Sequence, residues 1–204
     1  GIDANGVTAR PNAVNGLAIF NGSTNNRIGG TTAAQRNVLS GNTSSGIQIG
    51  TGNGGFNTIQ GNWIGLNATG TGLTPNGGNG IFLNSSDNTI GGTTPGARNV
   101  ISGNALPGIF IGNACQRTLV VGNYIGTDAS GTADFGNAQN GINLDQASNN
   151  QIGDGTFAGR NVISGNEFPG VYVLGPATGN TIRGNFGAEL TNQNLGTITP
   201  LTGG

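Results

Sequence analysis

The side chains that could carry acid–base or metal chemistry in this chain are few and scattered. The carboxylates are Asp3, Asp87, Asp128, Asp134, Asp145, Asp154, Glu167 and Glu189, and there is no histidine. Hydrolysis of a glycosidic bond needs two carboxylates placed around that bond. Asp145 directly follows a short apolar stretch, and no acid occupies the matching place in the neighbouring repeats. We therefore expect no catalytic residue, no metal site and no cofactor, and keep Asp145 only for the alternative that the chain is an enzyme.

Three arginines recur at a fixed interval and suggest a different kind of chemistry. Arg98 lies 62 residues after Arg36, and Arg160 lies 62 residues after Arg98. A guanidinium carries five donors, so it can bind several loop carbonyls at once. We expect these arginines to pin loops, with binding of a ligand as the alternative.

The arginines belong to a repeat that runs through most of the chain. A glycine opens each unit, at Gly16, Gly46, Gly80, Gly108, Gly141 and Gly170. Two kinds of unit alternate. A units carry a phrase that opens with IG and closes with RNVLSGN or RNVISGN, at residues 28–42, 90–104 and 152–166. B units carry the phrase GNWIG at residues 61–65, GNYIG at 122–126 and the shorter GNFG at 184–187. One unit cannot bury its own apolar face whereas stacked units can, so the pattern indicates a solenoid.

Each unit contains three short apolar pieces that alternate with the period of a strand and are too short for a helix. The residues expected to point inward are Leu17, Ile19, Ile47, Ile49, Ile81, Leu83, Ile109, Ile111, Ile142, Leu144, Val171 and Val173 on the first strands. On the second strands they are Ile28, Ile59, Ile90, Leu119, Ile152 and Ile182, and on the third they are Leu39, Ile64, Ile101, Ile125 and Ile163. Loops are inserted between strands two and three in A units (the A loops, as at 93–98). In B units they follow strand three (the B loops, as at 127–140).

Asparagine recurs before the second strand, at Asn26, Asn57, Asn88, Asn150 and Asn180. Its side chain tolerates left-handed backbone and hydrogen-bonds its own turn, so stacked asparagines suit stacked turns.

Two outward files of side chains contain the aromatic residues. The first strands carry Ala18, Gln48, Phe82, Phe110, Asn143 and Tyr172, and the third strands carry Val38, Trp63, Val100, Tyr124, Val162 and Phe186. For the third-strand file we expect the inserted loops, with Leu73, Phe135 and Phe157, to fold over it as a side core. The alternative is that it forms an interface, since a long apolar stripe is uncommon on a monomer. The aromatics of the first strands are candidates for contact with sugar rings or with a neighbouring molecule.

Composition narrows the class of protein. Of 204 residues 42 are glycine, 33% are hydrophobic and 7% are charged, with a net charge of −1. This suits a core a few side chains wide, and it provides no basic patch for nucleic acid. No apolar run reaches membrane-spanning length, so we expect no membrane insertion. The single Cys115 is expected to be structural, and the chain to be a mature or excised segment.

The repeats resemble those of a known group. The phrase from Asn57 to Ile64, NTIQGNWI, and the openings such as GIFL resemble the repeats of right-handed parallel β-helix proteins of the pectate-lyase-like superfamily. The phrases RNVISGN and GNYIGTDASGT are similar in particular to repeats of bacterial extracellular and surface proteins. The resemblance covers about residues 16–187. It implies an all-β, single-stranded right-handed parallel β-helix, here with about six to seven coils, in an extracellular or cell-surface setting. Enzymes of the superfamily often act on acidic polysaccharides.

Residues 1–187 are thus expected to form the helix, with 1–15 as a partial first coil. Residues 188–204 are expected to be a cap, a linker or an inter-subunit strand. The preferred function is a non-catalytic structural or adhesive solenoid, including a filament subunit that assembles with itself, with cell-surface or matrix polysaccharide as a further partner. A polysaccharide lyase or hydrolase is the alternative. Passive glycan or ice binding is the lesser one, because the outward file expected on the second strands (Arg27, Thr58, Thr89, Thr118, Gln151, Thr181) is a broken row of threonines.

Overall fold

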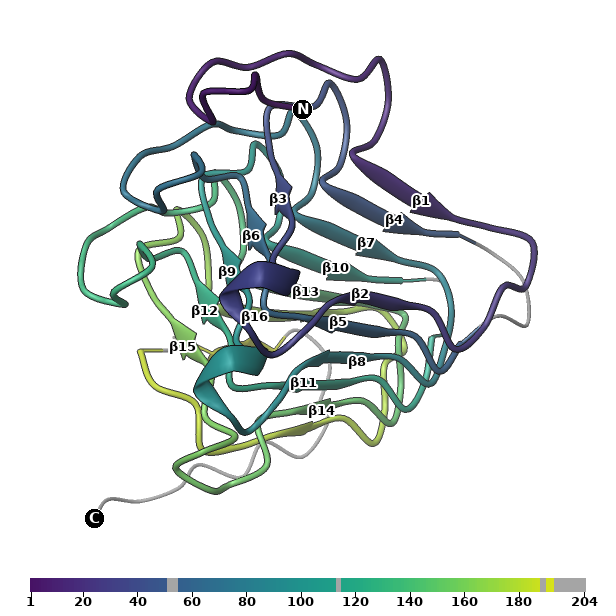
Figure 1. The fold of residues 1–204 in the computed structure, drawn as a ribbon. Helices are drawn as coiled ribbons and strands as arrows, with labels where there is room; N and C mark the ends of the chain where they lie inside the picture. Colours follow the sequence, from purple (N-terminus) through teal and green to yellow (C-terminus); the bar gives the residue numbers. More distant parts are fainter. Residues whose placement is uncertain (51–54, 113–114, 188–189, 193–204) are drawn as a thin grey trace.

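Three parallel sheets wrap around one narrow core in the computed structural model of the chain, which describes residues 1–50, 55–112, 115–187 and 190–192. Each sheet takes one strand from each turn of the chain (Figure 1). The protein is therefore a parallel β-solenoid, as the repeats predicted.

The first sheet has seven strands in order: β1 (Leu17–Ile19), β4 (Ile47–Ile49), β7 (Ile81–Leu83), β10 (Ile109–Ile111), β13 (Ile142–Asp145), β16 (Val171–Leu174) and β18 (Leu190–Asn192). The second has β2 (Arg27–Gly29), β5 (Thr58–Gln60), β8 (Thr89–Gly91), β11 (Leu119–Val121), β14 (Gln151–Ile152) and β17 (Thr181–Ile182). The third has β3 (Val38–Leu39), β6 (Trp63–Ile64), β9 (Val100–Ile101), β12 (Tyr124–Ile125) and β15 (Val162–Ile163).

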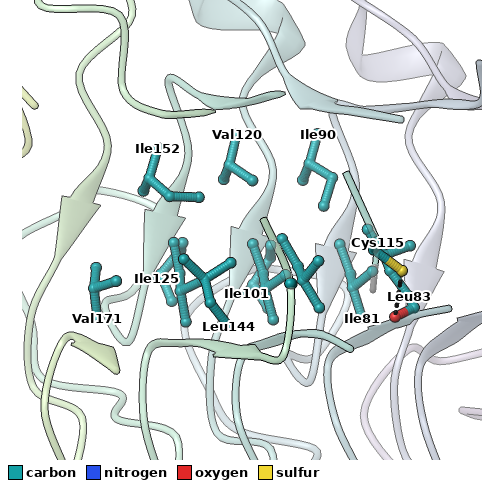
Figure 2. Packing of buried hydrophobic residues seen from close by; sticks show 14 of the residues in the cluster. Ile81, Leu83, Ile90, Ile101, Cys115, Val120, Ile125, Leu144, Ile152 and Val171 are labelled. Atoms are coloured by element: carbon teal, nitrogen blue, oxygen red, sulfur yellow. Dashed lines mark hydrogen bonds between the residues drawn. The ribbon is translucent and has the colours of Figure 1, made fainter. Parts of the chain in front are cut away.

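The core is a stack of β-branched and leucine side chains, one layer for each turn. Ile81, Ile90 and Ile101 of one turn are all fully buried, and they stack in register on Ile109, Val120 and Ile125 of the next. Figure 2 shows these layers side by side. Because the side-chain period of a strand is two, this register puts the whole expected inward set of the first and third strands inside.

One inward assignment was wrong by a single residue. In β11 it is Val120 that pairs with Ile90 and is buried, whereas Leu119 pairs with Thr89 on the outer face. Thr118, expected on the outer file, is instead buried in the turn before the strand. The outer file of the second sheet therefore has Leu119 in the place expected for a threonine.

The solenoid has about five turns rather than six to seven. Both ends account for the difference. Residues 1–15 make no parallel strand, and Ile2 and Ala9 instead close a loop through an antiparallel bridge. At the other end Phe186 makes an isolated parallel bridge with Val162 where a third strand would stand. Residues 190–192 pair with β16 of the same chain, and the rest of 188–204 lies outside the described residues.

The A loops are short, and the first two each contain a 3-10 turn, η1 (Ala33–Gln35) in the first and η2 (Pro95–Ala97) in the second. Each follows a glycine with positive φ, as at Gly29 (φ 82°), where a Cβ would collide with the carbonyl oxygen of Gln60 in the next turn. A side chain is excluded there on both counts, which explains the glycine that follows the second-strand isoleucine in each A unit, at Gly29, Gly91 and Gly153. Neither helix is long and apolar enough to cross a membrane, and the described residues contain no other helix.

Candidate functional site

The carboxylates are dispersed, as the sequence suggested. Asp145 is half-buried at the end of β13, and it pairs along the sheet with Leu174. Asp128 and Asp134 share a B loop, where Asp128 Oδ1 accepts hydrogen bonds from the backbone of Thr132 (3.0 Å) and Ala133 (3.1 Å). Glu189 lies outside the described residues. Within the described part of the chain, no three His, Cys, Asp or Glu side chains gather to hold a metal ion.

The aromatics of the first sheet lie on its outer face. Phe82 and Phe110 stack with ring centroids 5.0 Å apart and planes 8° from parallel. Further along the same face, Tyr172 lines a cleft of about 340 Å³ together with Gln139, Asn140, Phe168 and Pro169. The sheet register places Asn143 between Phe110 and Tyr172, so the aromatic file is interrupted.

The third sheet brings the other aromatics into contact with the three arginines. Arg36 Cζ lies 4.1 Å from the centroid of the Trp63 ring, and Arg98 Cζ lies 4.0 Å from that of Tyr124. The third member is looser, with Arg160 Cζ 4.9 Å from Phe157 and 5.7 Å from Phe186. We call these three arginines and four rings the arginine–aromatic row. A guanidinium over a ring face is attracted by the ring quadrupole, by roughly 0.5–1 kcal/mol at an exposed site.

A hydrogen bond fixes each of the first two arginines to the following turn. Arg36 Nε donates to the carbonyl of Gly61 (3.3 Å), and Arg98 Nε donates to that of Gly122 (3.2 Å). Each of these arginines thus contacts the next B unit in two ways, by a hydrogen bond to a backbone carbonyl and by packing on an aromatic ring.

The B loops contact the same rings. A Cβ on Gly70 would lie 2.8 Å from the Trp63 ring, and one on Gly131 would lie 2.6 Å from that of Tyr124. Val100, between the two rings on the sheet, is only 3% exposed. Of the residues expected to cover this file, Leu73 is 47% exposed and Phe157 85%. The cover therefore comes from arginines and loop glycines at least as much as from loop hydrophobics.

The sequence contained this arrangement, but in two separate patterns. Trp63, Tyr124 and Phe186 follow Arg36, Arg98 and Arg160 by 27, 26 and 26 residues. These separations are close to the length of one unit, so the ring and the guanidinium lie on neighbouring turns. Considering the two files together would have predicted the contact.

Two further files of asparagine were missed, although the file before the second strand was expected. One comprises Asn37, Asn62, Asn99, Asn123, Asn161 and Asn185, and the other comprises Asn12, Asn42, Asn76, Asn104, Asn137 and Asn166. Asn99 illustrates the pattern: its Oδ1 accepts from both the backbone N–H (3.0 Å) and the Nδ2 (3.1 Å) of Asn62. Its own Nδ2 donates to Asn123 Oδ1 (2.9 Å) and to the carbonyl of Ile59 (2.8 Å). These buried amides are satisfied and tie each turn to the next.

Three further ionisable side chains have local partners. Arg117 pairs with Asp87 (Nε–Oδ1 2.6 Å), and this hydrogen bond lowers the pKa of Asp87 below its usual value. Cys115 is buried, its Sγ lies 3.7 Å from the Leu83 carbonyl oxygen (Figure 2), and burial raises its pKa to about 11. A thiol with so high a pKa is protonated at neutral pH and unreactive as a nucleophile.

No protein-family model matches the chain, and no curated protein or solved structure matches it either. The structure itself shows a parallel β-solenoid with three files of asparagine and one arginine–aromatic row.

Proposed function

We propose that the chain is a non-catalytic structural and adhesive solenoid that acts outside the cell or at its surface. The observation that carries the proposal is the continuity of the asparagine files. The file through Asn99 joins six asparagines by side-chain hydrogen bonds of 2.8–3.1 Å, from Asn37 to Asn185. Such a stack is stabilised between neighbours along its axis, which suits a rod that presents the same surface at regular steps.

The sequence resemblance supports the same setting. The phrases RNVISGN and GNYIGTDASGT are similar to repeats of bacterial surface proteins, and the wider pattern is similar to the pectate-lyase-like superfamily. The partner surfaces we propose are other copies of the chain, end to end or side by side, and polysaccharide of the cell surface or matrix. Edge strands have unpaired backbone groups that can pair with another chain. In the structure β1 and β18 are the edges of the first sheet.

Assembly is tested by sedimentation and negative-stain microscopy of the purified chain at increasing concentration. We expect rods that lengthen or associate laterally as concentration rises. Single short rods at every concentration would contradict the assembly part of the proposal.

The non-catalytic part needs a separate assay. Pectin, alginate and glycosaminoglycans are incubated with the chain, and reducing ends and ultraviolet-absorbing unsaturated products are measured. We expect no product above the blank. Turnover that Asp145→Ala abolishes would show instead that the chain is a polysaccharide-active enzyme.

A further inference from the structure

We propose that the arginine–aromatic row binds a linear acidic polysaccharide whose charged groups are widely spaced. The inference rests on the proposed adhesive function and names the class of partner and the surface that binds it.

The two Nη atoms of Arg36 and of Arg98 are not used for hydrogen bonds within the described structure. In Arg36 and Arg98 the hydrogen bond to the next turn uses Nε, and neither Nη atom has a hydrogen-bond partner among the described residues. The ion pair found in the described part of the chain is that of Arg117 with Asp87, so no carboxylate neutralises the row. The two Nη groups of arginine form the fork that matches a carboxylate or sulfate.

The forks are also held in place before a ligand arrives. Arg98 lies over Tyr124 at 4.0 Å while its Nε is bound to the Gly122 carbonyl, so its long side chain is restrained at two points. Arg36 is restrained in the same way by Trp63 and Gly61. Ordering a free arginine side chain on binding costs conformational entropy, and this restraint removes part of that cost.

The spacing selects the kind of polyanion. The arginines recur on every second turn, and neighbouring turns of parallel strands lie about 4.8 Å apart, so the forks stand about 9.6 Å apart. Duplex DNA carries one charge per about 1.7 Å of its axis, far denser than the row can neutralise. A glycan in which acidic and neutral sugars alternate has the sparser charge that the row matches.

The neighbouring acids favour the same choice. The B loop that contacts Tyr124 carries Asp128 and Asp134, and the A loop of Arg160 carries Asp154. Asp128 and Asp154 are engaged by their own loops, through Ser130 (2.8 Å) and Thr156 (2.7 Å). They keep their charge all the same, so a densely charged polymer would meet repulsion from these loops beside the row. A sparsely charged one can place its neutral sugars there.

The test measures binding of a hyaluronan oligosaccharide to the full chain by calorimetry at low and moderate salt. Dextran, polygalacturonate and duplex DNA serve as neutral and dense comparisons. We expect hyaluronan to bind, more weakly as salt rises, and the three comparison polymers to bind at least several-fold more weakly. Arg36→Ala and Arg98→Ala should each weaken hyaluronan binding about tenfold, as expected for loss of a charge-assisted hydrogen-bond pair.

Arg117→Ala is the matched control, because Arg117 is exposed but already paired with Asp87. It should leave hyaluronan binding unchanged. Arg98→Lys keeps the charge and should retain only part of the affinity, since a lysine has no planar fork. Thermal unfolding of every variant verifies that it is folded.

Three results would overturn the inference: no hyaluronan binding by the folded chain, equal loss in Arg117→Ala and Arg98→Ala, or DNA binding as tight as hyaluronan. None of them bears on the rod assembly or on the absence of turnover. The proposed structural role therefore stands or fails on its own experiments.

Discussion

Thr118 stands at the one step where the asparagine file before the second strands is broken. Its backbone N–H donates to Asn150 Oδ1 (2.9 Å) as an asparagine there would, but its own Oγ1 is buried without a hydrogen bond in the described structure. Asn88 on the other side has no amide to reach, and its Nδ2 turns to the Ser85 carbonyl (2.8 Å). A buried polar atom without a partner costs about 1–3 kcal/mol, so this step is a weak point.

Replacing Thr118 by asparagine should close the gap and stabilise the protein. The new amide can accept from Asn88 and donate to Asn150, and we expect a gain of about 1 kcal/mol in the free energy of unfolding. For a chain of this size that corresponds to a melting temperature higher by about 2–4 °C. Thr89→Asn, on the outer face of the neighbouring turn, is the control and should change little. An unchanged or lower melting temperature for Thr118→Asn would show that an asparagine at this position does not complete the file of side-chain hydrogen bonds.

The pair of Asp87 and Arg117 gives a prediction on pH. The hydrogen bond from Arg117 lowers the pKa of Asp87, so the folded state favours the ionised carboxylate. This contribution to stability is present above the ordinary carboxyl pKa of about 3.9 and is lost as pH falls through the lowered folded value. Arg117→Ala should move the titration of Asp87, followed by NMR of its carboxyl carbon, up toward that ordinary value. A titration that stays where it was would show that another group sets this pKa.

The wrong register at Leu119 shows what a sequence can fix at the scale of a residue. Leu119, Val120 and Val121 are three apolar residues in succession, so alternation is satisfied with either phase. Only stacking on Ile90 decides that Val120 faces inward. In the other second strands a single isoleucine stands between residues that are not apolar, as in Thr58-Ile59-Gln60, and those assignments are confirmed.

At the scale of elements, two- and three-residue strands are held by the turns between them as much as by their own ladders. β9 has only Val100 and Ile101, yet Asn99 before it makes four side-chain hydrogen bonds to neighbouring turns. The sequence predicted the strands because apolar alternation is a local pattern. It concealed two of the three asparagine files, because asparagine is common throughout the chain and a file exists only between turns. The arginine–aromatic contacts were missed for the same reason.

Removing one rung of a file should therefore cost more than its size suggests. In Asn99→Ala the backbone N–H of Asn62 loses its acceptor inside the protein, and the side-chain amide of Asn62 is left with the carbonyls of Ile28 and Gln60. We expect a loss of about 3 kcal/mol in the free energy of unfolding, measured by chemical denaturation. Asn84→Ala is the matched control, since Asn84 is half-buried and its Oδ1 has no hydrogen bond in the described residues. Equal losses in the two variants would mean that the file contributes nothing beyond ordinary packing.

At the scale of the whole molecule, the protein is a one-dimensional stack in which each turn contacts only the next. The sequence predicted this architecture, because the repeat of A and B units cannot fold any other way and bury its apolar faces. It overestimated the number of turns. A unit at the end of the stack has the sequence pattern of a turn, but it has a neighbouring turn on one side only and so does not complete one. The loop closed by Ile2 and Ala9 illustrates this, since it resembles the B loops bridged at Leu66–Leu73 and Thr127–Asp134.

The stack predicts that the same substitution has different consequences at the centre and at the end. Ile101 is fully buried in β9, with Ile64 and Ile125 as neighbours on the two sides. Ile101→Asp places an unpaired charge in a core one side chain deep, and no neighbouring turn can close around it. We expect a loss of more than about 4 kcal/mol in the free energy of unfolding and a loss of cooperative unfolding, measured by circular dichroism and by the fluorescence of Trp63 in the adjoining strand.

Leu17→Asp puts the same charge in β1, which has a neighbour on one side only and where Leu17 is half-buried. That variant should lose the first turn by fraying while the remaining turns unfold cooperatively at nearly the original temperature. If both variants unfold the protein alike, stability is shared across the whole molecule rather than passed from turn to turn.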